Sequence, residues 1–283
     1  KNNNLLGITF MILSMLCLSI NDMTYKYLSF YFPVWESIFF RALSGSIMAL
    51  FLTMYFGIDK LKTKKPFGHA IRAFSASGCV VFYIYGINNL MLSENIAIAH
   101  SAPIIAAFLA VPILGEKIGI LRTSAILIGF IGVLIIVKPG TDLFKLESLY
   151  PLISACFMAS VYLSTRSVMS TDSSVAIIFY YSFALLITSL IFFPDDFIMP
   201  NTIQLIYAMS LGILGSLGHF FMSQAAKNAD VAVTSPFEYS SFIFVGLMGF
   251  LIFSEVPTYS IYLGGLIIIS SGIFIAYRER KNN

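Results

Sequence analysis

The sequence predicts an all-α, polytopic membrane protein whose ten transmembrane helices form two inverted five-helix repeats. Three observations predict this fold: the composition, the succession of apolar runs, and the distribution of positive charge between the loops. Hydrophobic residues make up 58% of the 283 residues and charged residues only 11%, whereas a soluble domain carries about 25% charged residues. The chain therefore cannot cover a water-facing surface of its own size, and the same numbers exclude a disordered chain or a disulfide-rich secreted scaffold.

The apolar runs are continuous and do not alternate with polar residues, which indicates helices rather than the strands of a barrel. A transmembrane helix needs about 20 mostly apolar residues. Short breaks with turn residues or charge, such as Phe32-Pro33 and Pro139-Gly140, separate the runs. The ten predicted spans are roughly 5–28, 33–57, 67–88, 94–114, 119–137, 149–168, 174–193, 202–225, 231–253 and 258–277.

The Lys and Arg residues in the loops predict the orientation, because cytoplasmic loops carry an excess of positive charge. With a cytoplasmic N-terminus, only Lys138 and Lys145 lie outside. The cytoplasmic set comprises Lys1, Lys60, Lys62, Lys64, Lys65, Lys117, Arg122, Arg166, Lys227, Arg278, Arg280 and Lys281. We therefore expect both termini in the cytoplasm and the chain in a bacterial plasma (inner) membrane.

The ten spans divide into a first repeat at 1–144 and a second at 145–283. An odd number of spans per repeat makes the second copy start on the opposite side of the membrane, so the repeats are inverted. The fourth span ends at Gly115-Glu116 and the ninth at Ser254-Glu255, which are corresponding positions. The fifth and tenth spans carry no ionisable residue in their interiors, and we expect them at the periphery, facing lipid or forming a homodimer.

Several short segments carry a resemblance to a known family. They are Asn21-Asp22 with Lys26, Phe39-Phe40-Arg41, Arg72, Ser235-Pro236-Phe237-Glu238-Tyr239, and the Gly-Glu and Ser-Glu ends of the fourth and ninth spans. With these segments the whole chain resembles the drug/metabolite transporter superfamily of the ten-helix EamA type, and within it the subgroup that contains bacterial S-adenosylmethionine uptake transporters. The resemblance implies a secondary transporter with a central cavity lined by all spans except the fifth and tenth.

Arg41 and Glu238 are charged residues deep inside predicted spans. A charge at the bilayer centre costs at least about 2.5–3.5 kcal/mol on insertion scales, so each needs a partner, water or a function. Each lies about eight residues into its span, from opposite sides, which at 1.5 Å per residue places both roughly 12 Å deep. We predict that they face one cavity near the midplane. They are either linked to substrate or proton movement, or form a salt bridge that ties the repeats together.

Each of the other candidate binding residues has both a functional and a structural interpretation. Asp22 and Lys26 have the spacing of a helical ion pair, whereas Asn21 lies on a polar stripe that favours a cavity. Glu36 and Arg72 lie about one turn from a membrane surface, where solvation also explains them. The predicted substrate-binding residues are Asn21, Asp22, Glu36, Arg41, Arg72, Tyr85, His100, Tyr162, Tyr181, His219, Glu238 and Tyr239.

The histidines and tyrosines of this set suit transport chemistry. His100 precedes Pro103, and a proline at this place can break the helix, as in many transporter sites. His100 and His219 can relay protons or serve as hydrogen-bonded packing residues. The tyrosines can contact a flat ring or a cationic centre, or form hydrogen bonds between helices.

The predicted function is secondary active transport of a small polar metabolite, zwitterionic or cationic, such as an amino acid or S-adenosylmethionine. The chain has no G-x-x-x-x-G-K-[ST] motif, so we expect a proton or a counter-solute rather than ATP to supply the energy. We expect no catalytic residues, no metal, no cofactor and no nucleic acid; the partners are the lipid bilayer and the substrate. The alternatives are a channel, a structural membrane protein, or an intramembrane enzyme, although G-x-S-x-G and H-E-x-x-H are absent.

Overall fold

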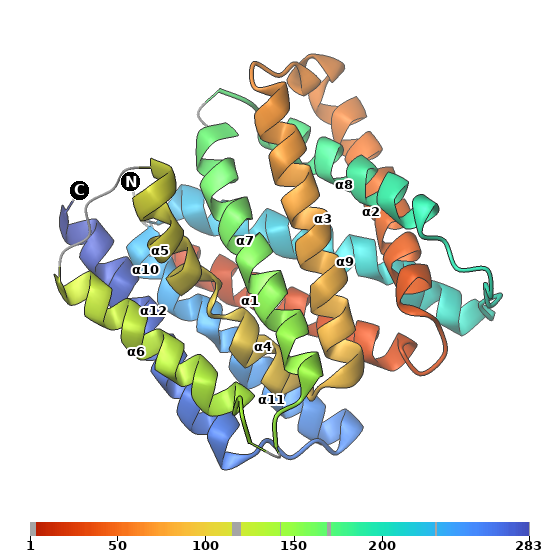
Figure 1. Cartoon of the computed structure of the whole chain (residues 1–283). Coiled ribbons are helices and arrows are strands. Elements are labelled where there is room, and N and C mark those ends of the chain that lie inside the picture. The colour runs from red at the N-terminus through yellow and green to blue at the C-terminus, as the bar shows by residue number, and fades with distance from the viewer. Residues whose placement is uncertain (1–3, 115–119, 142, 169–170, 230, 283) are drawn as a thin grey trace.

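The computed structural model describes residues 4–114, 120–141, 143–168, 171–229 and 231–282, and within them it contains helices and no strands (Figure 1). The first half holds α1 (Asn4–Leu28), α2 (Val34–Phe56), α3 (Pro66–Asn89), α4 (Leu92–Ala99), α5 (Ala102–Leu114) and α6 (Ile120–Val137). The second half holds α7 (Leu149–Val168), α8 (Ser174–Ile191), α9 (Thr202–Asn228), α10 (Val231–Thr234), α11 (Ser240–Phe253) and α12 (Tyr259–Asn282). Three 3-10 turns join them: η1 (Ile58–Leu61), η2 (Leu146–Ser148) and η3 (Ser235–Tyr239).

The predicted fold class is confirmed. By length and composition, six segments of the described chain are long and apolar enough to cross a membrane, and four shorter apolar helices accompany them. Each of the ten coincides with one predicted span. The ends follow local sequence signals: Pro66 opens α3, and Asn201 and Gln204 form a capping box at the start of α9.

The fourth and ninth spans are both interrupted. The fourth span divides into α4 and α5 at His100 and Ser101, just before Pro103, because proline lacks an N–H and its ring displaces the carbonyl four residues earlier. The ninth span passes through α10, η3 and α11, and its 3-10 turn begins at the Ser235-Pro236 step. The sequence indicated a break at Pro103 in the fourth span, and the structure places one in each repeat.

The main helix contacts join one repeat to the other. The first helix of the first repeat, α1, packs along the third of the second repeat, α9, and α3 packs along α7 in the same way. The related pairs α2 with α8 and α6 with α12 also pack together. This reciprocal pattern is the one that two inverted five-helix repeats produce. The boundary at 144/145 lies in the connection between α6 and α7 and stays a prediction.

α6 and α12 lie side by side at the left edge of the bundle in Figure 1. Their backbones touch, because a methyl group at Gly264 would place its carbon 2.6 Å from the carbonyl oxygen of Gly132. Leu127 and Ile131 of α6 are exposed on the outside. These glycines therefore serve packing within the chain, α6 and α12 are peripheral, and the homodimer stays a prediction.

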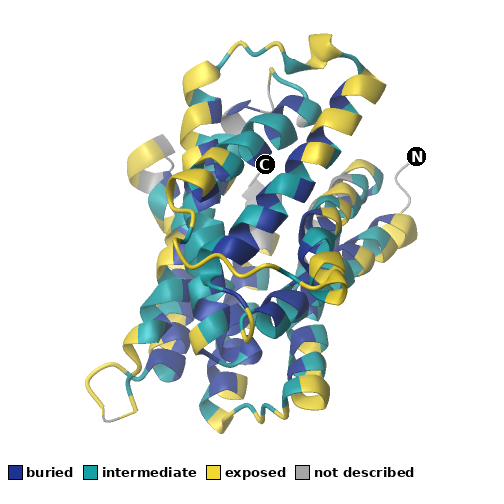
Figure 2. Ribbon diagram, turned by 90° about the vertical axis from the view of Figure 1, so that its right-hand side faces the viewer, coloured by how far each residue is buried: buried dark blue, intermediate teal, exposed yellow. Residues whose placement is uncertain are grey.

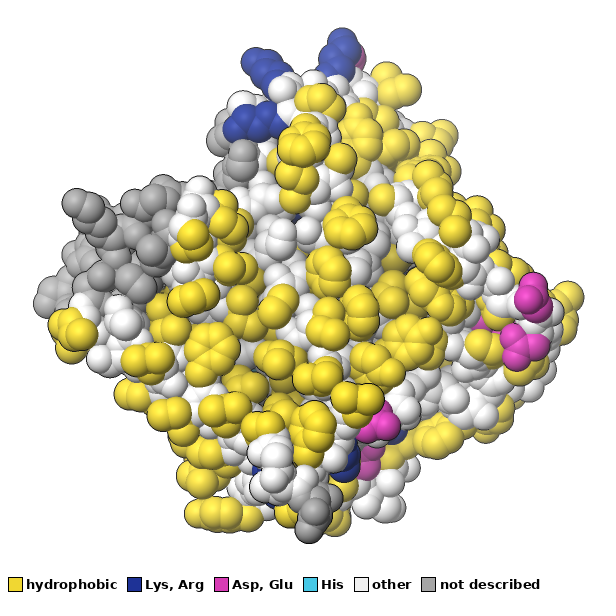
Figure 3. Space-filling view, viewed as in Figure 1, with side chains coloured by type: hydrophobic (Ala, Val, Ile, Leu, Met, Phe, Trp, Pro, Cys, Tyr) yellow, Lys and Arg dark blue, Asp and Glu magenta, His cyan; other side chains and the backbone are white. Residues whose placement is uncertain are grey.

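The burial pattern suits a membrane environment. Buried residues lie on the inner faces of the helices, and exposed ones on their outer faces and in the connections (Figure 2). Hydrophobic side chains cover the middle of the face in Figure 3, whereas Lys and Arg gather at its top and Asp and Glu at its right and lower edges. An apolar belt with charge at the ends is the surface that a bilayer requires.

Candidate substrate cavity

A cavity of about 220 Å³ lies where the two interrupted spans meet. Its lining comes from α1, α2, α3, α4, α5, α7, α9, η3 and α11, with His100 between α4 and α5, and not from the described residues of α6, α8 and α12. The resemblance implied a contribution from the seventh span, α8, and the described residues of that helix make none. The polar part of the lining consists of Ser19, Asn21, Asp22, Arg41, Cys79, Tyr83, His100, Ser154, Tyr162, Glu238, Tyr239 and Ser241. Neither Gly132 nor Gly265 lines it, as we expected for the fifth and tenth spans.

Arg41 projects from α2 and is held by neutral groups. It donates to the Asn21 side-chain oxygen at 3.3 Å and to the Tyr25 hydroxyl at 3.4 Å. Asn21 in turn donates to the carbonyl of Leu211 on α9 at 2.6 Å. Arg41 and Glu238 line the same cavity but form no salt bridge with each other. The structural alternative, a salt bridge between the repeats, is therefore absent from this conformation.

Asp22 and Lys26 do not form the local ion pair that their spacing allows. Asp22 accepts a hydrogen bond from the hydroxyl of Tyr83 on α3 at 2.7 Å. The Lys26 ammonium instead contacts Glu255 at 3.1 Å. It also donates to carbonyls at the end of α3, where the helix leaves acceptors without an internal partner. Tertiary partners therefore replace the helical pair, and Asp22 remains in the cavity.

The two interrupted spans touch through their polar residues. The His100 Nε2 and the Ser241 Oγ are 3.0 Å apart, and the rings of His100 and Tyr239 lie 5.1 Å apart. Ser241 also donates to the carbonyl of Glu238 at 2.7 Å. The break in each helix thus places a titratable side chain, His100 or Glu238, in the cavity wall.

Seven of the twelve predicted substrate-binding residues line the cavity: Asn21, Asp22, Arg41, His100, Tyr162, Glu238 and Tyr239. Glu36 does not. It is buried at the start of α2 and accepts the backbone N–H of Ile198 at 3.1 Å. Arg72 does not either, since its Nε donates to Thr165 on α7 at 2.7 Å. Each charged group thus has a tertiary hydrogen-bond partner near the end of a span, whereas the second carboxylate oxygen of Glu36, Oε1, is buried without one.

The other three predicted residues also lie outside the cavity lining. Tyr85 packs against Tyr150, with 5.5 Å between the ring centroids. Tyr181 packs against a hydrophobic core cluster and lies beside Arg41. His219 is exposed on the surface of α9. Residue type and position in a span predicted these three residues, but neither says which neighbour a side chain faces.

Several lining residues escaped the sequence-based selection. Tyr83 and Cys79 come from α3, and Ser154 from α7. Three methionines, Met15, Met158 and Met222, supply part of the apolar wall. No spacing pattern marks them, because they converge from three helices that are distant in sequence. Only Tyr83 carried a signal, as a buried hydroxyl that requires a partner.

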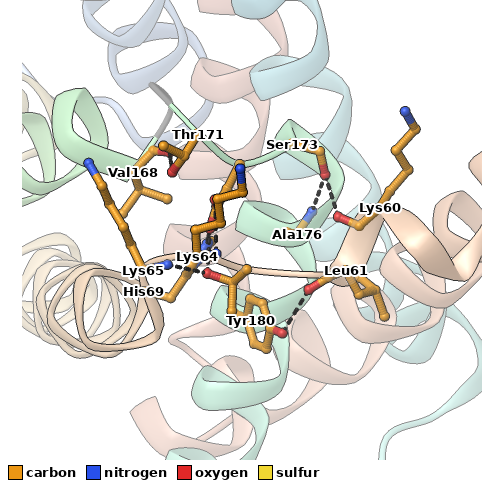
Figure 4. A network of polar contacts seen from close by, with 12 residues as sticks. Lys60, Leu61, Lys64, Lys65, His69, Val168, Thr171, Ser173, Ala176 and Tyr180 are labelled. Atoms are coloured by element: carbon orange, nitrogen blue, oxygen red, sulfur yellow. Dashed lines mark hydrogen bonds and ion pairs between the residues drawn. The ribbon is translucent and has the colours of Figure 1, made fainter.

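A second polar network lies where the α2–α3 connection and the start of α3 meet the α7–α8 connection (Figure 4). Asp172, in the connection between α7 and α8, accepts from the Thr63 hydroxyl, from the backbone N–H of Lys64 at 3.3 Å, and pairs with His69 Nε2 at 2.9 Å. These hydrogen bonds, above all that of Thr63, hold the pKa of Asp172 well below its usual range. The network joins the α2–α3 connection to the α7–α8 connection, hence one repeat to the other.

Comparisons with known proteins match the whole chain. The sequence profile of the EamA-like transporter family matches residues 5–138 and 146–277. The S-adenosylmethionine uptake transporter of Rickettsia prowazekii is 31% identical over 276 residues, which are 98% of this chain and 94% of that protein.

Other relatives carry other substrates. The riboflavin transporter of Vibrio cholerae is 30% identical over 80% of this chain and 76% of that protein. The pseudopaline exporter CntI of Pseudomonas aeruginosa is 25% identical over 97% of each. A protein of known crystal structure matches with a TM-score of 0.62 over 98% of each chain at 16% identity, which shows a shared fold.

Proposed function

Because the chain belongs to the EamA-like transporter family, we propose that it is a secondary active carrier of a small zwitterionic or cationic metabolite, which binds in the cavity beside Arg41, Asp22 and Glu238. The chain is an integral membrane transporter and not an enzyme. The proposal concerns the class of substrate, the residues that bind it and the source of energy.

One observation carries the proposal: the charged side chains Arg41, Asp22 and Glu238 line one cavity but form no direct ion pair with one another. Arg41 contacts neutral Asn21 and Tyr25, and Asp22 contacts neutral Tyr83. Glu238 forms no ion pair with the described residues. Separate charges away from bulk water are costly unless a ligand or water compensates them. A zwitterion does so, with its carboxylate at Arg41 and its cationic group at the acidic residues.

S-adenosylmethionine has this chemistry, since it carries a carboxylate, an ammonium, a sulfonium and an aromatic base. The tyrosines Tyr162 and Tyr239 suit a cationic centre or a flat ring. Relatives named S-adenosylmethionine uptake transporters, at 29–31% identity, support the same substrate. A proton gradient or exchange against a counter-solute supplies the energy in this proposal.

Reconstituted protein tests the substrate class. In proteoliposomes we expect saturable uptake of radiolabelled S-adenosylmethionine and counterflow when the vesicles are loaded with the unlabelled compound. The same compound should raise the unfolding temperature, because a ligand that binds only the folded state stabilises it. Riboflavin, which lacks these charges, is the matched comparison. Non-saturable flux would instead indicate a channel, and counterflow with riboflavin alone would refute the charge argument.

The orientation has its own test. We propose that both termini and the connection between α2 and α3 face the cytoplasm of a bacterium, because the positive charge of the chain concentrates there. Single cysteines at Lys62 and Thr141, both exposed, report on opposite ends of the bundle. In intact cells an impermeant thiol reagent should label Thr141→Cys at once and Lys62→Cys only after permeabilisation. The reverse labelling pattern would invert the topology.

A further inference from the structure

We propose that Lys26 and Glu255 form a gate that closes one end of the cavity and opens once in each transport cycle. The proposal rests on the proposed role of the cavity in transport. The Lys26 Nζ lies 3.1 Å from Glu255 Oε1 and donates to the carbonyls of Ile87 at 3.0 Å and Leu90 at 2.5 Å. An ammonium has three donors, and here each has a partner.

The position of this pair fits a gate. Lys26 lies one helical turn beyond Asp22 on α1, and Ile87 lies one turn beyond Tyr83 on α3. Asp22 and Tyr83 line the cavity and contact each other. The pair therefore forms the next layer outward, at the end where α1, α3 and α11 terminate.

Glu255 belongs to the second repeat and contacts residues of the first repeat in this layer. α11 ends at Phe253, its C-cap residue Ser254 has a left-handed backbone (φ 55°), and the N–H of Glu255 donates to the carbonyl of Gly249 at 3.0 Å. Its second carboxylate oxygen accepts the N–H of Leu92, at the start of α4, at 2.8 Å. The Glu255 side chain thus joins the end of α11 in the second repeat to α1 and α4 of the first, and Lys26 extends the contact to the end of α3.

The chemistry of the pair suits repeated opening. Both side chains are only 12% exposed, so desolvation offsets much of their attraction, and water can replace it when the helices separate. An apolar plug of the same size would instead expose its whole surface to water on opening. In the pair of Lys145 and Glu94, at 3.3 Å, Lys145 is 51% exposed although Glu94 is only 9% exposed. Water screens the ammonium, so the pair contributes little and serves as a control.

Native Cys79 is the reporter for the first test, because it lines the cavity about two helical turns inward from Ile87 on α3. With Cys17 and Cys156 replaced by serine, an impermeant thiol reagent is added on the side at which Thr141→Cys reacts. We expect Glu255→Gln to raise the labelling rate of Cys79 about tenfold, which corresponds to about 1.4 kcal/mol in favour of the open state. Glu94→Gln should leave the rate unchanged. No substrate is involved, so the result is independent of the substrate proposal.

The second test closes the gate covalently. Lys26→Cys with Glu255→Cys, in a background without other cysteines, is cross-linked by a short thiol-reactive reagent with a reducible linker. Cross-linking should abolish transport of whichever compound the carrier moves, and reduction should restore it. Cross-linked Asp59→Cys with Lys62→Cys, a pair within one exposed connection, should transport normally. Unchanged Cys79 labelling in Glu255→Gln, or transport by the cross-linked gate, would overturn the proposal.

Discussion

Replacing Glu238 by glutamine is expected to lower the transport rate at least about tenfold and to leave the unfolding temperature within a few degrees of that of the wild type. Glu238 lies in the 3-10 turn of the ninth span and lines the cavity. It forms no ion pair with the described residues, so neutralising its carboxylate leaves no positive charge without its partner. The loss should therefore fall on substrate binding and not on folding. Uptake in proteoliposomes and thermal unfolding in detergent measure the two effects separately.

Arg41 provides the matched comparison for this prediction. Because Arg41 and Glu238 are not in contact, the effects on stability of Arg41→Gln and Glu238→Gln should add within about 0.5 kcal/mol in the double mutant. Asp59→Asn, at an exposed position, controls for the loss of one acidic charge. A double mutant clearly more stable than the sum would show that the two charges pair in another conformation. Wild-type uptake by Glu238→Gln would remove Glu238 from the binding site.

Replacing Gly212 by alanine is expected to destabilise the protein by about 1–3 kcal/mol or more, through overpacking at a contact between helices. On α9, the new methyl carbon would lie 2.2 Å from Ser44 Oγ, 2.4 Å from the Gly45 nitrogen and 2.6 Å from the Arg41 carbonyl oxygen. Two of these atoms belong to the backbone of α2, so α2 must move as a whole. The N–H of Gly212 also donates to Ser44 at 3.1 Å, and that bond would be strained.

The displaced helix carries Arg41, so transport should fall together with stability. Thermal unfolding measures the first effect and uptake at a permissive temperature the second. Gly246→Ala is the matched control, because a methyl group there meets no atom within 4 Å. In a helix this exchange is otherwise favourable by roughly 0.5–1 kcal/mol. Equal stability of the two variants would contradict the close approach of α2 and α9.

The spans were predictable because the bilayer fixes their length and composition. The depth of a residue in the membrane could also be predicted from its position along the helix, and Arg41 and Glu238, predicted at the same depth, line one cavity. Depth does not identify the neighbours of a side chain, which is why Tyr85 and His219 lie outside the lining. Lys26 shows the limit most clearly: the sequence offers Asp22 four residues away, whereas the fold brings Glu255, more than two hundred residues distant.

The 3-10 turn of the ninth span was missed for a related reason. Pro236 was visible in the sequence, but the length and apolar character of the run favoured one continuous helix. The structure places Glu238 and Tyr239 in that turn, where a regular helix would direct them differently. These two cavity-lining side chains thus lie where the regular helical pattern is interrupted.

The packing of first-repeat helices against second-repeat helices has a consequence for biosynthesis. Ser14 on α1 donates to the carbonyl of Gly218 at 2.7 Å, and Asn21 donates to that of Leu211. At the time that α1 enters the bilayer, the ribosome has not yet made α9. The polar groups of α1 must then find temporary partners in the insertion machinery or in neighbouring helices until about two hundred further residues are synthesised. Neither half of the chain can complete its own core, so the nascent protein reaches its final arrangement only after translation has passed α9.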